Sequence, residues 1–187
     1  MLAGRRNEER GIENKIPIVN SYNEWDPLEE VIVGSLEGAV IPSSHLSVAI
    51  TVPKRVVPLF RLASGFRFPS FMVKPANKEI DELIGVLRGE GIVVRRPDPI
   101  DGRQMIKTPF WQSRGFCTAC PRDGFLVIGE QIIETPMPWR CRYHESFAYR
   151  RLFREYFEKG AGWTSAPKPA LKDEIYDNSY VMPRAGE

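Results

Sequence analysis

The feature that most constrains the fold is an order of elements that occurs twice: strand, amphipathic helix, strand. In the first occurrence, the apolar stretch 28–34 (LEEVIVG) is followed by a predicted helix over 77–88 and then by the apolar triplet Ile92–Val94. Every third or fourth residue of that helix is apolar: Ile80, Leu83, Ile84 and Leu87. Such spacing places these residues on one face, and strands separated by amphipathic helices are typical of α/β proteins. We expect Asn77 to cap this helix and Gly89 to end it.

The second occurrence follows the same order. Residues 124–129 and 131–134 predict a hairpin that turns at Gly129 and Glu130, and residues 163–166 predict a short strand. Between them, a helix is predicted to begin at Pro136 or Pro138 and to run to Lys159. Its aromatic face would contain four side chains, namely Tyr143, Phe147, Phe153 and Phe157. The proline-rich stretch 35–74 predicts a long irregular connection with short helical turns.

Composition limits the class of protein and its partners. A chain of 187 residues with 42% hydrophobic residues can bury a core as one domain. The net charge of +2 disfavours nucleic acid as a partner, and no apolar run is long enough to cross a membrane. Residues 1–16 are polar and charged, so we expect a flexible N-terminal arm without a secretion signal. An odd count of three cysteines favours a reducing, cytoplasmic location.

Four residues have the spacing of a zinc site. Cys117 and Cys120 form a C-x-x-C pair, and Cys141 and His144 form a C-x-x-H pair. Thiolates and imidazoles are preferred zinc ligands. The alternatives are three unconnected cytosolic thiols or a redox pair, although this C-x-x-C does not open a helix after a strand.

Three further side chains are candidates for chemistry. Asp123 precedes an apolar strand, where its carboxylate could bind a guanidinium in bidentate fashion or could simply form a turn before Gly124. Arg150 could stack on an aromatic ring or pair with a buried acid. His45 is a formal candidate base, but no nucleophile is near it in sequence, and we interpret it as a loop histidine in water.

Five stretches of the chain, in order from about residue 17 to about residue 177, resemble the glycine amidinotransferase family. This family includes arginine:glycine amidinotransferases and bacterial relatives that act on inosamine phosphates. The stretches are Ser21–Gly34 (SYNEWDPLEEVIVG), Val94–Asp101 (VRRPDPID), Pro121–Asp123 (PRD), Ile133–Arg140 (IETPMPWR) and Gly162–Pro169 (GWTSAPKP).

The resemblance implies a fold and a reaction. The family fold is a pseudo-fivefold α/β propeller of ββαβ-type modules, of which about two would be present, near 17–100 and 101–180. Residues 17–187 would then form the N-terminal portion of an amidinotransferase domain. Family members move the amidino group of arginine to an acceptor amine, glycine or a related amine, through a covalent amidino-cysteine, and release ornithine. No metal or organic cofactor is implied.

One residue carries over to a family role. Asp123 matches the aspartate of the Pro-Arg-Asp stretch that binds the guanidinium. The nucleophilic cysteine and the catalytic histidine of the family lie in later modules, so we identify no catalytic residue and expect this chain to be inactive alone. The alternatives are a non-catalytic truncated binding protein and the zinc module. Uncovered sheet edges and module faces would favour self-association into a homo-oligomer.

Overall fold

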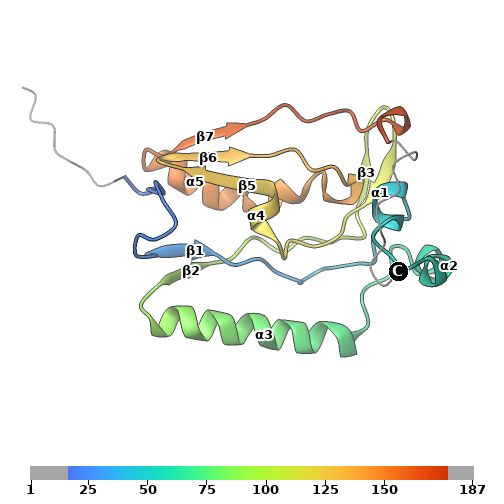
Figure 1. The fold of residues 1–187 in the computed structure, drawn as a ribbon, viewed down its shortest axis with the longest axis horizontal. Helices are drawn as coiled ribbons and strands as arrows, with labels where there is room; N and C mark the ends of the chain where they lie inside the picture. Colours follow the sequence, from blue (N-terminus) through green and yellow to red (C-terminus); the bar gives the residue numbers. More distant parts are fainter. Residues whose placement is uncertain (1–16, 177–187) are drawn as a thin grey trace, which may run out of the picture.

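The structure is a computed structural model and describes residues 17–176 (Figure 1). The predicted arm at residues 1–16 and the end of the predicted second module lie outside this range. The strands are β1 (Glu30–Ile32), β2 (Val93–Arg95), β3 (Met105–Lys107), β4 (Gln112–Arg114), β5 (Phe125–Ile128), β6 (Gln131–Glu134) and β7 (Gly162–Ser165). The α-helices are α1 (Leu46–Ala49), α2 (Val57–Leu62), α3 (Ser70–Gly89), α4 (Pro121–Gly124) and α5 (Arg150–Glu158). Short 3₁₀ helices occupy Lys54–Val56, Arg140–Arg142, Glu145–Tyr149 and Asp173–Ile175.

The first predicted unit is present as β1, α3 and β2. The two strands are parallel neighbours, with Val31 opposite Val94, and α3 forms the crossover between them. The predicted end of the helix at Gly89 is confirmed, but the predicted start at Asn77 is wrong, because α3 begins at Ser70. Pro75 lies inside the helix. It costs one backbone hydrogen bond close to the N-terminal end, and helices tolerate such a loss there better than at their centre.

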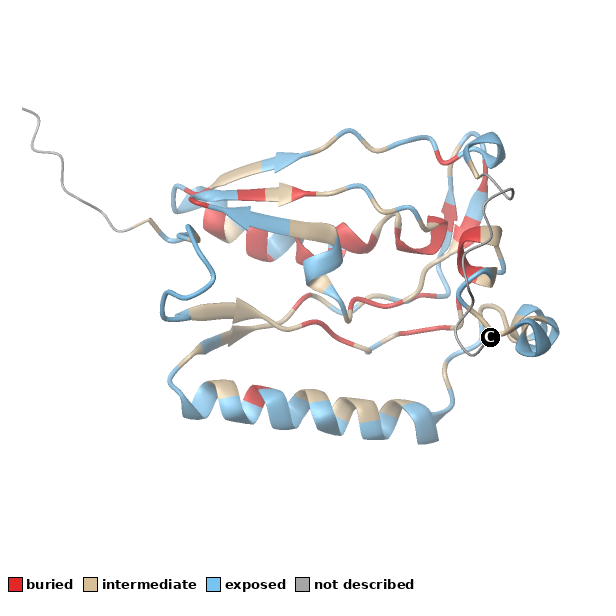
Figure 2. Ribbon diagram, in the orientation of Figure 1, coloured by how far each residue is buried: buried red, intermediate tan, exposed pale blue. Residues whose placement is uncertain are grey.

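Helix α3 lies beside the β1–β2 pair and is mostly exposed (Figure 2). Ile84 is its only buried residue, while Leu83 and Val86 on its surface are 51% and 65% exposed. The predicted apolar stripe therefore exists, but only its middle is covered.

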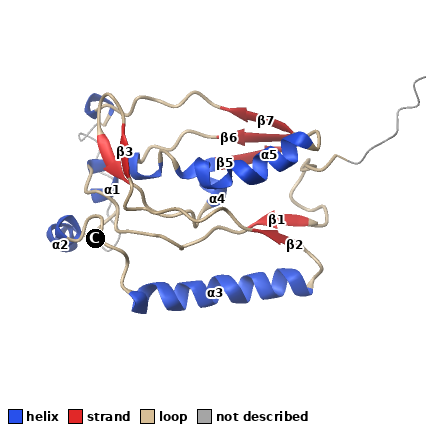
Figure 3. Ribbon diagram, turned by 180° about the vertical axis from the view of Figure 1, so that it is seen from behind, coloured by secondary structure: helices blue, strands red, loops and turns tan. Residues whose placement is uncertain are grey.

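The second predicted unit is confirmed in its strands. The hairpin β5–β6 turns at Gly129, whose positive φ of 55° suits glycine, and β7 pairs with β6 in parallel. Helix α5 lies along one face of this three-stranded sheet (Figures 1 and 3).

The predicted helix from Pro136 or Pro138 to Lys159 is only partly correct. Two separate 3₁₀ segments precede α5, which begins at Arg150. Because a 3₁₀ helix has three residues per turn rather than 3.6, the predicted aromatic face loses its phase. Phe153 is buried as expected, but Phe147, which lies in a 3₁₀ segment, is 47% exposed. Phe157 is also 57% exposed, although it lies in α5 one turn after Phe153, near the end of the helix.

The main core lies between α5 and the three-stranded sheet. Its buried members are Ile132, Ala148, Tyr149, Leu152, Phe153, Tyr156 and Ala161. The ring of Phe125 packs edge-on against both Tyr149 and Phe153, at centroid distances of 4.7 Å in each case. Aromatic pairs in this geometry contribute beyond the area that they bury.

Polar contacts join the two units. Tyr156 of α5 donates a hydrogen bond to Glu30 of β1, and Arg95 of β2 forms an ion pair with Glu155 of α5. An unpredicted hairpin, β3–β4, precedes the second unit. The α/β class is confirmed, and the sheets within residues 17–176 have two, two and three strands, none of which closes. The number of modules stays a prediction.

The segment after β7 folds back onto the body of the protein. The guanidinium of buried Arg140 donates two hydrogen bonds to the carbonyl of Leu171, at 2.9 and 2.6 Å, and one to Asp173. The indole N–H of Trp111 donates to the carbonyl of Ala170 at 2.6 Å. Leu171 is itself 2% exposed and has a positive φ of 51°. This backbone angle is unfavourable for leucine, so burial of its side chain and the two donors must hold it in place.

No helix within residues 17–176 combines the length and the apolar composition needed to cross a bilayer.

Candidate functional site

The predicted site residue Asp123 lies on α4, one helical turn between Cys120 and β5. Pro121 occupies the start of the turn, where its fixed φ suits a helix and its missing N–H is not needed. Thr135, at the end of β6, fixes the other side. Its hydroxyl donates to the carbonyl of Asp123 at 3.1 Å, and its N–H donates to the carbonyl of Gly124 at 2.9 Å. The backbone of Asp123 is therefore held by the neighbouring strand.

The carboxylate of Asp123 binds a guanidinium that belongs to the protein. The Nη1 atom of Arg142 donates to Oδ2 of Asp123 at 2.7 Å. The other edge of the same guanidinium faces Glu145, to which Nε and Nη2 both donate. Nη2 also donates to the carbonyl of Cys120 at 3.2 Å. Arg142 thus joins α4 to the 3₁₀ helices that precede α5.

The three residues of this group differ in how far their side chains are buried. The side chains of Arg142 and Glu145 are only 10% and 7% exposed, whereas that of Asp123 is 45% exposed. Only Oδ2 of Asp123 accepts a side-chain hydrogen bond in the described part of the chain. A partly exposed carboxylate with one oxygen free of the protein can accept a hydrogen bond from a second donor.

The charges of the group support one another. Burial acts to lower the pKa of Arg142, but hydrogen bonds and charges from Glu145 and then Asp123 outweigh it and raise that pKa. Burial raises the pKa of Glu145, and the hydrogen bonds from Arg142 act in the opposite direction. Charge-assisted bidentate pairs of this kind are among the strongest side-chain interactions.

The strand that follows Asp123 differs from expectation. The sequence predicts that Asp123 lies at the mouth of a buried strand, but three residues of β5 are 46% to 59% exposed, namely Leu126, Val127 and Ile128. The expectation is wrong because β5 is an edge strand, covered on one face by α5 and uncovered on its other face and along its free edge (Figure 2).

The zinc alternative is wrong for this structure. Within residues 17–176, no three His, Cys, Asp or Glu side chains are placed to hold a metal ion, so Cys117, Cys120, Cys141 and His144 do not form a site. His144 instead stacks on Phe147 at a centroid distance of 4.6 Å.

The three thiols are not activated. Burial raises the pKa of Cys117 to about 11 and that of Cys141 to about 12. Cys120 is exposed, yet partial burial and the charge of Asp123 also raise its pKa. The thiolate is the nucleophilic form of cysteine, so none of the three is prepared for attack near neutral pH.

The two remaining candidates have structural contacts. Arg150 stacks on Phe147, with its guanidinium carbon 4.1 Å from the ring centroid, which confirms the stacking alternative. The interpretation of His45 as a loop histidine in water is wrong. Its Nδ1 accepts from the N–H of Ser47 and so caps α1, while its Nε2 lies 3.7 Å from Asp173. Only 17% of the His45 side chain is exposed.

Sequence reasoning missed Arg142 and Glu145. Their spacing of three residues, in a segment predicted to be helical, is compatible with an ion pair, and this signal could have been used. Nothing local to the sequence shows that the same arginine reaches Asp123, which is 19 residues away.

Comparison with known proteins relates the chain to one class of enzyme. No protein-family model matches the chain. Glycine amidinotransferase, mitochondrial, of Xenopus tropicalis is 49% identical over 164 residues, which are 88% of this chain and 39% of that protein. The corresponding protein of Gallus gallus is 48% identical over the same shares. L-arginine:L-lysine amidinotransferase of Pseudomonas savastanoi pv. phaseolicola is 45% identical over 89% of this chain and 46% of its own length.

Solved structures agree with the sequence comparison. The amidinotransferase SxtG of Microseira wollei, from the saxitoxin biosynthetic pathway, superposes with a TM-score of 0.80 at 49% identity, over 90% of this chain and 49% of its own. The inosamine-phosphate amidinotransferase of Streptomyces griseus superposes with a TM-score of 0.74 at 41% identity, over 86% of this chain and 46% of its own.

The predicted resemblance is therefore confirmed: the chain is homologous to amidinotransferases, which are transferases, over most of its own length. It spans less than half of the length of these curated relatives and matches their N-terminal portion. The names of the vertebrate relatives place those proteins in mitochondria. The compartment of this chain stays a prediction.

Proposed function

We propose that this chain supplies the guanidinium-binding aspartate of an arginine-dependent amidinotransferase. In that reaction a cysteine thiolate bonds to the guanidinium carbon of arginine. The bond from this carbon to the side-chain nitrogen then breaks, and ornithine leaves after the nitrogen takes up a proton. The acceptor amine attacks the same carbon, loses a proton and releases the thiolate. Glycine or a related amine is the proposed acceptor.

One observation carries the proposal. Asp123 already holds a guanidinium, that of Arg142, at 2.7 Å through Oδ2, and its partly exposed side chain leaves Oδ1 without a hydrogen bond from the described part of the chain. Arg142 is itself bound on its other edge by Glu145, so it orients the carboxylate without covering it. A substrate guanidinium could donate to the free Oδ1 of Asp123.

We propose that none of the three cysteines of this chain is the nucleophile of the reaction. All three cysteines of the 187-residue sequence lie in residues 17–176, and the pKa of each is raised. The present chain is therefore expected to bind arginine without releasing ornithine from it.

The variant Asp123→Asn tests the proposal. An amide keeps the turn but offers one acceptor oxygen and adds a donor that opposes a guanidinium. Loss of a charge-assisted hydrogen bond should weaken arginine binding by about 10-fold or more. Binding of L-arginine to the chain is measured by saturation-transfer NMR, with folding checked by circular dichroism.

Asp101→Asn is the matched control. Asp101 is also an aspartate bound to a guanidinium, that of Arg103 at 3.0 Å, but on an exposed loop. Its variant should bind arginine like the wild type. Equal arginine affinity of Asp123→Asn and wild type would show that Asp123 only forms a turn.

A further inference from the structure

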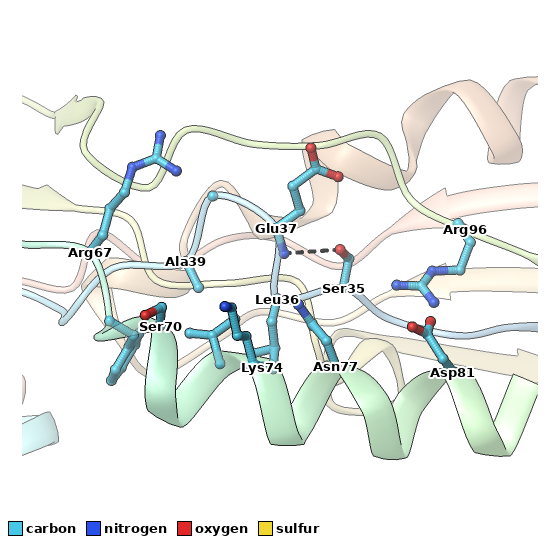
Figure 4. Close-up of a pocket in the computed structure, with 13 residues that line it drawn as sticks. Ser35, Leu36, Glu37, Ala39, Arg67, Ser70, Lys74, Asn77, Asp81 and Arg96 are labelled. Carbon is cyan, nitrogen blue, oxygen red and sulfur yellow. Dashed lines mark hydrogen bonds between the residues drawn. The ribbon is translucent and has the colours of Figure 1, made fainter.

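A cavity of about 490 Å³ lies between the N-terminal half of α3 and the segment that follows β1 (Figure 4). Three parts of the chain form its walls: residues 35–39, residues 67–81 and Arg96. Asp123 does not line it, so the cavity is separate from the proposed guanidinium site. Its volume lies within the range of small-molecule sites in proteins.

The wall that α3 contributes is unusually polar. Its lining side chains recur at spacings of four, three and four residues, as Ser70, Lys74, Asn77 and Asp81. A helix that lies against the body of a protein normally turns apolar side chains toward it. In this half of α3 only Val73 does so at the cavity. The polar stripe therefore does not serve packing.

Three cationic side chains reach the cavity from different walls. Arg67 precedes α3, Lys74 lies on it, and Arg96 follows β2. Within residues 17–176, neither Lys74 nor Arg96 has a side-chain hydrogen bond or an ion pair. In Figure 4 the side chains of Lys74 and Asn77 lie along the floor between Arg67 and Arg96. Two carboxylates, Glu37 and Asp81, also line the cavity, and Asp81 lies beside Arg96 in Figure 4. The lining therefore carries three positive and two negative charges, and this excess of positive charge favours an anion.

We propose that this cavity binds the phosphate group of a small phosphorylated compound. A phosphate monoester carries close to two negative charges and three terminal oxygens near neutral pH, so it can accept more charge-assisted hydrogen bonds from the cationic side chains of the cavity than a carboxylate can. The amide of Asn77 and the hydroxyl of Ser35 supply neutral donors. Asp81, beside Arg96 in Figure 4, can accept a hydrogen bond from a hydroxyl group on the remainder of the compound.

Calorimetric titration with glycerol 3-phosphate at low ionic strength tests the proposal. The wild-type chain should bind it saturably and should bind acetate far more weakly. Lys74→Ala and Arg96→Ala should each weaken binding by about 10-fold, because each removes a charge-assisted hydrogen bond. Both residues are solvent-accessible at the cavity, so the melting temperature should not change.

Lys78→Ala is the control. Lys78 lies one turn along the same helix but outside the cavity, in an exposed ion pair with Glu82. It should leave the affinity unchanged. Asp123→Asn should also bind glycerol 3-phosphate like the wild type, whatever its affinity for arginine. Absence of saturable binding, equal binding of acetate, or equal weakening by Lys78→Ala would overturn the proposal.

Discussion

Helix α5 has nine residues and buries Leu152, Phe153 and Tyr156, whereas α3 has twenty residues and buries only Ile84. Both helices lie in a strand–helix–strand unit, so the order of elements alone does not decide how well a helix is covered. The partner sheet differs. Helix α5 packs on three strands of four residues each, while α3 faces two strands of three residues.

The dimensions explain the difference. A twenty-residue helix is about 30 Å long, whereas a strand of three residues spans about 10 Å and neighbouring strands lie about 5 Å apart. The β1–β2 pair can therefore cover only the middle of α3. The second unit also supplies aromatic rings, including Tyr149 and Phe153, that fill the space beneath α5. Coverage depends on sheet width and side-chain volume.

The largest predicted effect separates the two helices directly. Phe153→Ala should lower the free energy of unfolding by about 3 to 5 kcal/mol, because it leaves a cavity in the core. Leu83→Ala in α3 should lower it by less than about 1 kcal/mol, since Leu83 is half exposed. Urea denaturation measures both. Similar losses for the two variants would mean that α3 is covered in solution.

The next comparison uses one ion pair from each unit. Glu145→Gln leaves the guanidinium of Arg142 buried with only Asp123 as a charged partner, so a loss of about 2 to 4 kcal/mol is expected. Glu82→Gln breaks an exposed pair with Lys78 and should cost no more than about 0.5 kcal/mol. Thermal unfolding monitored by circular dichroism gives both values. If Glu145→Gln lowered the free energy of unfolding no more than Glu82→Gln does, the guanidinium of Arg142 would not be buried in solution.

A third change tests whether the outer face of α3 is free. Gly85 lies inside α3, and an added Cβ would meet no atom within 4 Å. Gly85→Ala should stabilise the protein by about 0.5 to 1 kcal/mol, because alanine favours the helix and restricts the unfolded chain. Gly34→Ala is the contrasting variant, since its Cβ would lie 2.2 Å from the carbonyl oxygen of Ala119. If Gly85→Ala destabilised the protein, another segment would have to pack against α3 at this position.

The smallest predicted effect concerns pH. Burial and then the charge of Arg140 lower the pKa of His45 below its ordinary 6.5, despite the opposing effect of Asp173. The unfolded state therefore binds more protons than the folded state below about pH 6.5, so stability should fall as the pH decreases from 7.5 to 5.5.

His45→Asn isolates this contribution. Asparagine keeps a side-chain acceptor for the N-cap of α1 but does not titrate. The variant should lose less melting temperature than the wild type over the same pH range. The remaining loss is expected from His144, whose pKa is also lowered, chiefly by burial. Identical pH profiles for the two proteins would contradict the assignment.

The same contrast shows which features sequence can predict. The hairpin β5–β6 was predictable because two β-rich runs flank Gly129, which adopts a positive φ. The hairpin β3–β4 was not, since its strands of three residues, MIK and QSR, are too short to show a periodic pattern. The 3₁₀ segments before α5 change the phase of a helical pattern without changing its composition.

The candidate site also has one part that the sequence predicts and another that depends on tertiary contacts. The Pro-Arg-Asp stretch singles out Asp123 and suggests a guanidinium as its ligand. That Arg142 supplies a guanidinium within the protein depends on a tertiary contact between α4 and the segment before α5. The polar wall of α3 was not predictable, because helical spacing places Ser70, Lys74, Asn77 and Asp81 near one another but does not show that they face a cavity.

The contact between Arg140 and Leu171 has a consequence for the order of folding. During synthesis, Trp111 and Arg140 leave the ribosome well before Ala170 and Leu171, whose carbonyls their side chains bind. Until those residues emerge, the body of the protein holds a guanidinium and an indole N–H without these acceptors. Closing the loop of about 60 residues from Trp111 to Ala170 should therefore be a late step of folding on the ribosome.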